Sequence, residues 1–354
     1  MFHGARIAIA PLDWGLGHAT RVIPIIQRLC ELDAVPVIIA DEAPLALLRD
    51  VFPDLAHARL PGVQVRYSRG SSQALAMAGQ FPAMLRSIRQ EHALFQRAQR
   101  ELHLDAVISD NRFGVRASRI PSVIITHQVF PFTPMAQGVL RRMNRYQLER
   151  FDSCWVMDEP EAPGLAGELA HGSRLPVNAR YIGTLSRMDP KARMSPKGYR
   201  VVAVISGPEP QRSIFQEILL AELQELSGEH LLVRGLPMQE ERMVTGRVTM
   251  VPHLRGEELA AALLQAELIV SRGGYTTLMD LVALGRTALL VPTPGQQEQE
   301  YLGRLHQGTG RFLVQSQDRL DLQGALQRGA VRPQPIGPNR LLEAALHDLA
   351  ERIG

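Results

Sequence analysis

Two glycines and a histidine follow the first apolar run of the sequence, in "PLDWGLGHA" at positions 11–19. Gly15 and Gly17 can take positive φ in a strand-to-helix turn, and with Leu16 they let another molecule approach the backbone. An imidazole in the first turn of a helix stays neutral because the helix dipole disfavours its charged form, so it can accept a proton. His18 is therefore a candidate general base, and a helix-capping or packing histidine is the alternative.

A second segment, "SRGGYTTLMDLVALG" at 271–285, carries the groups that hold a phosphate. Gly273 and Gly274 offer backbone N–H groups, and Thr276 and Thr277 offer hydroxyls at a helix N-terminus, where the dipole adds partial positive charge. Asp280 lies one turn further on, where it can accept hydrogen bonds from the vicinal hydroxyls of a ribose. An ordinary glycine-containing loop is the alternative, but it does not account for so many polar groups in one turn.

Two further loops belong with this segment. "ISGPEPQR" at 205–212 places Ser206 and Gly207 after another apolar run, and two such loops can grip one nucleotide diphosphate. "VPTPGQQEQEYLG" at 291–303 supplies carboxamides and carboxylates that can bind sugar hydroxyls. A solvated helix start would account for its acids but not for its many glutamines.

The elements that must position these groups alternate along the chain. In the first half, short β-branched runs predict strands at 5–11, 35–40, 106–110, 122–127 and 153–158, with helices between several of them. The segment 73–102 suits one long amphipathic helix, or two with a break at Pro82. This order predicts a parallel sheet covered on both faces.

A second series of the same kind begins near residue 200. Strands are expected at 199–206, 230–235, 247–252, 267–272, 287–292 and 310–315, and helices near 212–226, 256–265, 276–285 and 296–307. We therefore expect an N-terminal Rossmann-like domain (1–184), a linker (185–198), a C-terminal Rossmann-like domain (199–335) and a final helix (336–354) that packs back on the first domain. Two parallel sheets joined in this way leave a cleft at their carboxyl strand ends, where ligands bind.

The composition of the chain indicates its kind of partner and its cellular compartment. The chain has 354 residues, 45% hydrophobic and 5% aromatic, and its formal charge of +3 is too small to indicate a nucleic-acid partner. Cys30 and Cys154 have apolar neighbours and are expected in the core of a protein from a reducing compartment. A signal-peptide pattern and an apolar run of about 20 residues are both lacking, so we expect a cytoplasmic protein.

The first loop matches the dinucleotide-binding fingerprint G-x-G-x-x-G only in part. Gly15 and Gly17 fit its first two glycines, but Thr20 stands at the third, although Asp41 could imitate the acid that binds the ribose. A dehydrogenase has no evident use for His18 in that loop. The fingerprint therefore indicates a dinucleotide enzyme only weakly.

"GLGHATR", "SRGGYTTLMDLVALGRTALLVPTPGQQEQEY" and the two-domain plan resemble the family 28 glycosyltransferases of GT-B fold. The resemblance implies that Gly15, Leu16, Gly17 and His18 form the loop beside the reacting centre. It also implies a donor site for a nucleotide sugar, made by the residues of the motifs in the C-terminal domain and linker: Arg187, Ser206, Gly207, Arg272, Gly273, Gly274, Tyr275, Thr276, Thr277, Asp280, Gln299 and Glu300.

Several positions depart from the family pattern. Asp280 stands where the family usually has Glu, and Glu300 replaces the second of two glutamines near the donor sugar, which leaves recognition of N-acetylglucosamine open. The "SGPEPQR" loop carries two prolines that the family's version lacks. On the acceptor side, "THQV" with His127 and Gln128 replaces a "HEQN" run. Asp110 and Asn111 end the strand "AVISD" and either face the cleft or cap the following turn.

The reaction implied is an inverting transfer from a nucleotide diphosphate sugar, most simply a UDP-sugar, to an acceptor hydroxyl, with His18 as base. Neither a metal nor another cofactor is expected, since the sequence has no D-x-D motif and no cluster of metal ligands. A cell-envelope or lipid-linked acceptor is one expectation. The basic segment "VLRRMNRYQLER", with Arg141, Arg142, Arg145 and Arg150, would then contact an anionic membrane surface, or else form a solvated helix face.

Three other functions stay open at this point. A non-hydrolysing UDP-sugar 2-epimerase shares the fold and donor site but needs further catalytic acids. A dinucleotide-dependent oxidoreductase is disfavoured by Thr20. A non-catalytic nucleotide-sugar sensor would use the donor site without chemistry at His18.

Overall fold

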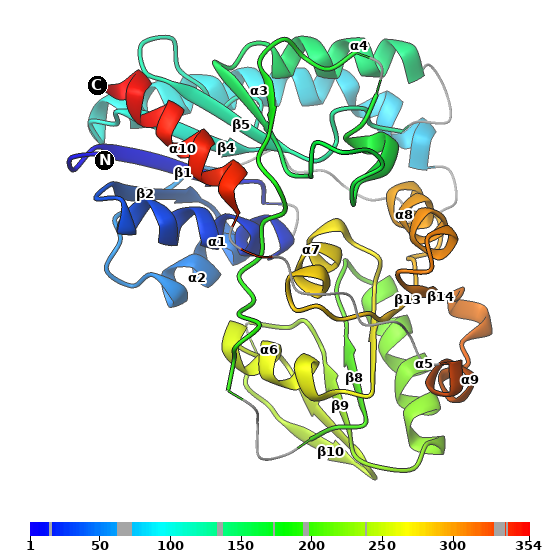
Figure 1. The fold of residues 1–354 in the computed structure, drawn as a ribbon. Coiled ribbons are helices and arrows are strands. Elements are labelled where there is room, and N and C mark those ends of the chain that lie inside the picture. The colour runs from blue at the N-terminus through cyan, green and yellow to red at the C-terminus, as the bar shows by residue number, and fades with distance from the viewer. Residues whose placement is uncertain are drawn as a thin grey trace. The chain divides into compact units, whose positions relative to one another are not determined.

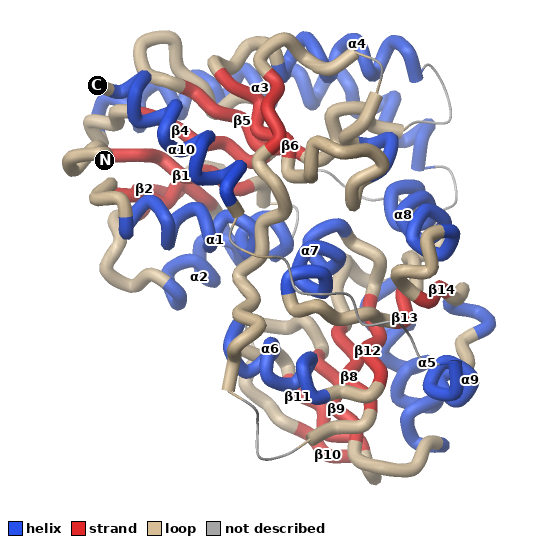
Figure 2. The backbone as a smooth tube through the Cα atoms, viewed as in Figure 1, coloured by secondary structure: helices blue, strands red, loops and turns tan. Residues whose placement is uncertain are grey.

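The computed structural model describes residues 1–13, 16–61, 73–132, 137–172, 174–193, 198–237, 239–328, 337 and 339–354, without the side chains of 73–85. The chain divides into two compact units. Unit 1 comprises Met1–Leu185 and Pro338–Gly354, and unit 2 comprises Ser186–Gly337. Each unit is an α/β structure built on its own seven-stranded sheet (Figures 1 and 2).

The sheet of unit 1 is parallel throughout and has the strand order β3-β2-β1-β4-β5-β6-β7. Its strands are β1 (Arg6–Pro11), β2 (Val35–Ala40), β3 (His57–Arg59), β4 (Ala106–Asp110), β5 (Ser122–Thr126), β6 (Ser153–Val156) and β7 (Ala179–Tyr181). Its helices are α1 (Leu16–Glu31), α2 (Glu42–Val51), α3 (Gln73–Glu101), α4 (Gln137–Leu148), the short 3-10 helix η1 (Gly167–Leu169) and α10 (Arg340–Ile353).

Both faces of this sheet carry apolar side chains, and helices pack on both of them. On β1, Ala8 and Ala10 pack in a cluster with Phe95 of α3, whereas Ile7 and Ile9 alternate with them and point to the opposite face. Helix α1 contacts β1 and β2. The near-continuous apolar runs in the sequence therefore reflect strands that are buried on both sides.

The register of unit 1 brings the carboxyl ends of three strands together. Pro11 of β1 pairs with Asp110 of β4, and Asp110 pairs with Ile125 of β5. Polar residues that follow these strands in the sequence are thus placed at one edge of the sheet.

The C-terminal helix α10 is held in unit 1 by its N-cap. The Asn339 side chain accepts from the N–H of Leu342 at 3.0 Å and donates to the carbonyls of Ile182 (2.8 Å) and Thr184 (3.0 Å). Glu343 also accepts two hydrogen bonds from Arg28 of α1. The end of the chain is therefore part of the first unit's structure.

Unit 2 repeats the architecture with the strand order β10-β11-β9-β8-β12-β13-β14, in which only β10 is antiparallel to its neighbour among the described strands. The strands are β8 (Val201–Val204), β9 (His230–Val233), β10 (Met243–Thr245), β11 (Val248–Val251), β12 (Leu268–Ser271), β13 (Leu289–Leu290) and β14 (Leu313–Val314). The helices are α5 (Gln211–Glu225), α6 (Gly256–Gln265), α7 (Tyr275–Ala283), α8 (Gln297–Gly308), the 3-10 helix η2 (Gln317–Arg319) and α9 (Leu322–Arg328).

The core of unit 2 lies between the sheet and helices α5 and α9. Phe215 and Leu219 of α5 and Leu322 of α9 pack on Val201, Ala203 and other residues of one sheet face. Figure 1 shows α6 and α7 on the other face. Helix α7 begins shortly after the buried strand β12 ends, so its N-terminus lies at the carboxyl end of that strand.

The expected α/β fold with parallel sheets is confirmed, and every expected strand is present, although β13 and β14 are shorter than predicted. Helix α3 runs through Pro82 as one helix. Three short strands were not predicted, β3, β7 and β10, because their sequences "HAR", "ARY" and "MVT" lack an apolar run. Cys154 is buried as expected, but the prediction for Cys30 was wrong, since it is exposed.

Candidate functional site

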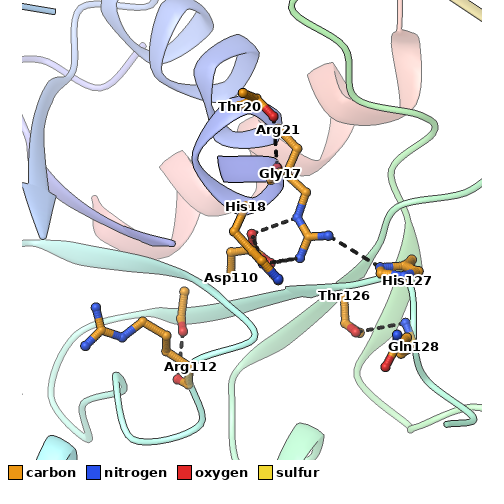
Figure 3. A network of polar contacts seen from close by, with 10 residues as sticks. Gly17, His18, Thr20, Arg21, Asp110, Arg112, Thr126, His127 and Gln128 are labelled. Carbon is orange, nitrogen blue, oxygen red and sulfur yellow. Dashed lines mark hydrogen bonds and ion pairs between the residues drawn. The ribbon is translucent and has the colours of Figure 1, made fainter. Parts of the chain in front are cut away.

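The His18 side chain lies against the carboxylate of Asp110 (Figure 3). The two come from the first turn of α1 and the last residue of β4, and His18 Nδ1 is 2.9 Å from Asp110 Oδ2. Asp110 is fully buried, whereas 19% of the His18 side chain is exposed. The imidazole can therefore be reached from solvent while the carboxylate behind it cannot.

Arg21 completes this group, and its role was not predicted from the sequence. Its Nε donates to Asp110 Oδ2 at 2.7 Å and its Nη2 donates to Asp110 Oδ1. Nη2 is also 2.7 Å from His18 Nδ1, and Nη1 is 3.5 Å from His127 Nδ1. A sequence signal existed: Arg21 is a charged residue on the helical face of Ile25 and Leu29, which are buried.

The charges of this group shift two pKa values. Burial alone would raise the pKa of Asp110, but the Arg21 cation and the His18 hydrogen bond outweigh it and lower that pKa to about 2. Burial lowers the pKa of His18, and the Arg21 cation lowers it further, against the opposing effect of Asp110. The arrangement is an ionised carboxylate paired with an arginine beside a neutral imidazole, which is the protonation state that a general base needs.

The other residues predicted for the acceptor side lie in different environments. Gly15 lies outside the described residues, whereas Leu16 and Gly17 begin helix α1, so the expected turn geometry at Gly17 was wrong. Asn111 takes a left-handed conformation (φ 55°) and donates its N–H to the Ile125 carbonyl, which makes it part of the turn after β4. His127 is buried near Arg21, as Figure 3 shows, and the Gln128 backbone is bonded to Thr126 and Asn144.

In unit 2, the N-terminus of α7 borders open space. A Cβ built on Gly274 would meet no atom within 4 Å, and one on Gly273 would meet only the Gln299 carbonyl at 3.6 Å. Neither glycine has a positive φ, so backbone conformation does not demand them. Thr276 and Thr277 are half-buried in the first turn and Tyr275 is buried. Backbone N–H groups at this terminus lie where an anion can approach closely.

Asp280, one turn into α7, belongs to a second polar cluster. Ser186 Oγ donates to Asp280 Oδ1 at 2.6 Å, and Arg187 interacts with the same carboxylate electrostatically. Burial raises the pKa of Asp280 to about 6, against the lowering effects of Ser186 and Arg187. Within the described residues, the Arg187 Nε is buried without a hydrogen-bond partner, and the Arg187 Cδ lies 4.0 Å from the Cβ position of Gly256 at the start of α6.

Arg272, predicted to contact the donor, is surrounded by hydrogen-bond acceptors of the protein itself. Its side chain is buried and its guanidinium donates to the carbonyls of Val291, Pro292 and Gln211 and to the Gln317 side chain. It also lies 3.9 Å from the centre of the Phe215 ring. Arg272 therefore holds neighbouring loops in place, because its hydrogen bonds are directed into the protein.

The loop before α8 is braced by its own acid and amide. Gln299 Oε1 accepts from the N–H of Thr293 and Glu300 Oε1 accepts from the N–H of Gly295, each at 2.9 Å. Ser206 and Gly207 are exposed after β8, and Gly207 has a φ of 104°, which requires glycine. These residues shape the carboxyl end of the second sheet.

The described residues contain neither a cluster of metal ligands nor a membrane-spanning helix. In the described part of the chain, no three His, Cys, Asp or Glu side chains gather as a metal ion would require. None of the described helices has both the length and the apolar character needed to cross a bilayer.

The overall structure resembles solved glycosyltransferases. MurG from Acinetobacter baumannii superposes with a TM-score of 0.54 and 12% identity over 98% of this chain and 95% of that one. The spinosyn rhamnosyltransferase SpnG complexed with thymidine diphosphate superposes with a TM-score of 0.61 and 14% identity, over 98% and 96%. The chain therefore has the GT-B fold.

Sequence similarity links part of the chain to one family of glycosyltransferases. Residues 256–321 match the glycosyltransferase family 28 C-terminal domain. A stretch of 204 residues is 28% identical to UDP-N-acetylglucosamine--N-acetylmuramyl-(pentapeptide) pyrophosphoryl-undecaprenol N-acetylglucosamine transferase of Rhodopseudomonas palustris strain BisB5, covering 53% of this chain and 51% of that protein. The chain thus spans about half the length of the curated relatives it matches. The resemblance to family 28 glycosyltransferases is confirmed.

Proposed function

We propose that this protein is an inverting glycosyltransferase that moves a hexose from a nucleotide diphosphate sugar to an acceptor hydroxyl. The observation that carries the proposal is the pairing of His18 with the buried Asp110 carboxylate. A neutral histidine that is partly exposed and oriented by a carboxylate is the usual form of a general base. The family 28 match in residues 256–321 supports the reaction class.

In this reaction His18 Nε2 removes the proton of the acceptor hydroxyl while its oxygen attacks the anomeric carbon. The bond from that carbon to the diphosphate oxygen breaks, and the nucleoside diphosphate leaves with the electron pair. Attack opposite the leaving group inverts the anomeric configuration. Asp110 stabilises the imidazolium that forms, as its low pKa keeps it ionised throughout.

The donor is held by unit 2. We assign the diphosphate to the N-terminus of α7 at Gly273 and Gly274, where open space and N–H groups coincide, with Thr276 and Thr277 beside it. Arg187, whose Nε is buried without a hydrogen-bond partner among the described residues, supplies positive charge to the leaving group, and Asp280 accepts from ribose hydroxyls. Ser206 and Gly207 form the adjoining loop. No metal has a role in this scheme, and no other cofactor.

We infer the donor base and the acceptor from the proteins that this chain resembles. The curated relative is named for UDP-N-acetylglucosamine and an undecaprenol-linked acceptor, whereas SpnG was solved with thymidine diphosphate. We favour UDP, with a lipid-linked, cell-envelope acceptor used on the cytoplasmic side. Gln299 and Glu300 brace the loop that precedes α8.

Helix α4 is the surface we assign to the membrane. Val139 (60% exposed) and Tyr146 (62%) project from it together with the exposed Arg142, while Arg150 follows it and stacks on Tyr146 at 5.7 Å. Arg141 stacks on Phe130 and Phe132. Exposed apolar groups among arginines suit the headgroup region of an anionic bilayer, and a lipid-linked acceptor would lie there.

A thermal-shift screen with UDP, TDP, GDP and NAD tests the donor site. A nucleotide present at 100 times its Kd stabilises the protein by about 2.7 kcal/mol. We expect a shift with UDP and none with NAD, and a shift with NAD alone would contradict the proposal.

An assay of UDP release separates transfer from epimerisation. A transferase should release UDP from the UDP-sugar only when an acceptor is present. Tight UDP binding without turnover on any acceptor would instead indicate a sensor.

A further inference from the structure

Arg21 is a buried cation that the reaction above does not use. Its side chain is 3% exposed, and burying a guanidinium is costly unless it is paired and hydrogen-bonded. The partner is Asp110, bound through both oxygens by Nε and Nη2. Arg21 lies three residues after His18, so both side chains leave the same side of α1 and meet one carboxylate.

This geometry fixes the orientation of the carboxylate. Asp110 Oδ2 accepts from Arg21 Nε at 2.7 Å and faces His18 Nδ1 at 2.9 Å, while Oδ1 is taken by Arg21 Nη2. Rotation of the carboxylate would break the two-point contact with the guanidinium. Arg21 therefore decides which oxygen His18 meets.

The protonation of His18 follows from its two neighbours. Nδ1 faces the Asp110 oxygen, which only accepts, and Arg21 Nη2 at 2.7 Å, which only donates. If Nδ1 carries the proton, it donates to Asp110 and Nε2 is left as a base. If Nδ1 accepts from Arg21, the proton sits on Nε2 and His18 cannot act. In the first arrangement the ionised Asp110 oxygen accepts a charge-assisted hydrogen bond from the His18 N–H, and we assign that arrangement.

We propose that Arg21 is the positioning residue of His18: its two-point grip on Asp110 holds the Nδ1–H tautomer and leaves Nε2 free to take the acceptor proton. This inference rests on the proposed function of His18, but its tautomer and its titration can be measured without a substrate.

Arg21 also acts through its charge. The charged or titratable groups that face His18 are Arg21 on the same helix, Asp110 after β4 and His127 after β5. The Arg21 cation lowers the pKa of His18, whereas Asp110 raises it. Removal of the cation therefore raises the pKa of His18, and the acid limb of the activity profile moves to higher pH.

The test is ¹⁵N NMR of the full chain labelled at histidine, with His18→Gln used to assign the His18 signals. Arg21→Gln removes the cation and the grip, and Arg21→Lys keeps the cation but not the planar two-point contact. Arg28→Gln is the matched control, because Arg28 lies on the same helix and pairs with Glu343.

We expect wild type and Arg28→Gln to show the Nδ1–H tautomer. Arg21→Gln should show mixed His18 tautomers and a raised His18 pKa. Arg21→Lys should show mixed His18 tautomers with a His18 pKa near that of the wild type. In the transfer assay, kcat should fall about 10- to 100-fold in Arg21→Gln with the donor KM unchanged, as for other residues that orient a functional histidine.

An Nε2–H tautomer in the wild type would overturn the inference, as would unchanged His18 signals in Arg21→Gln. If Arg21→Gln does not fold, the wild-type tautomer and Arg21→Lys still decide it. Absence of transferase activity in a wild type with the expected tautomer would remove the proposed function and leave the assignment of Arg21 intact.

Discussion

Ser186 Oγ donates a 2.6 Å hydrogen bond to Asp280 Oδ1, which ties the segment before β8 to helix α7 across 94 positions of the sequence. This bond opposes the effect of burial, which raises the pKa of the Asp280 carboxyl to a net value of about 6. The residue proposed to bind the donor ribose is therefore half-protonated at about pH 6.

This relationship predicts a pH dependence of donor binding. Above about pH 6 Asp280 is ionised and accepts strongly from hydroxyls, so UDP affinity should fall as pH drops through 6. Ser186→Ala removes a hydrogen bond to the ionised Asp280, which should move the midpoint of the UDP affinity above pH 6. Asp280→Asn should bind UDP weakly at every pH, with no midpoint near pH 6. Calorimetric titration from pH 5 to 8 measures this.

The same raised pKa of Asp280 predicts that the free energy of unfolding increases as the pH falls, whereas UDP affinity decreases. The folded state binds the Asp280 proton more tightly than the unfolded state, whose pKa is near 3.8, so this group stabilises the fold as pH falls from about 6 toward 4. In Asp280→Asn that contribution should be lost. A midpoint in UDP affinity that persists in Asp280→Asn would show that another group titrates.

Gly274 provides a test of the phosphate site. Its φ of −73° is open to alanine and the new Cβ would meet no protein atom, so Gly274→Ala should melt at the wild-type temperature. The methyl group would occupy the space assigned to the diphosphate, and a displacement of about 1 Å can cost about 10²-fold in kcat/KM. Gly308→Ala, also in open space, is the control and should keep full activity. Unchanged kinetics in Gly274→Ala would place the donor elsewhere.

The surface of α4 predicts binding to anionic vesicles at low salt. Arg142→Glu with Arg150→Glu should weaken the partition coefficient by at least about 30-fold, since each lost arginine contributes about 1 kcal/mol and the new carboxylates are repelled by the surface. Arg49→Glu with Arg100→Glu, on α2 and α3, makes the same charge change at other exposed positions of unit 1. Co-sedimentation with vesicles of anionic phospholipid measures both pairs. Equal losses would mean that net charge, rather than this helix, governs binding.

Asp110→Asn removes the negative charge of the side chain but keeps its size and shape. The amide no longer stabilises the imidazolium, so kcat should fall by about 10²-fold or more while UDP affinity stays the same. The buried Arg21 then loses its counter-charge, which costs about 3–5 kcal/mol of stability. Kinetics should therefore be measured below the lowered melting temperature, which circular dichroism gives. A wild-type kcat in this variant would exclude Asp110 from the reaction.

The sequence alone predicted the strands that carry buried apolar runs and the groups that follow them, such as His18 and Asp110. It missed what depends on pairing across the fold. Arg21 becomes significant only because β4 brings Asp110 beside α1, 89 residues away in the chain. Arg272 was assigned to the donor from its place in a motif, whereas the carbonyls that surround it come from distant loops. The edge strands β3, β7 and β10 had no apolar run that could have predicted them.

The most direct measurement is single-turnover transfer by wild type and His18→Ala, with UDP affinity measured in parallel. If His18 is the general base, the rate should fall by about 10²-fold or more while the Kd for UDP is unchanged, because the donor groups belong to unit 2. A wild-type rate in His18→Ala would contradict the account.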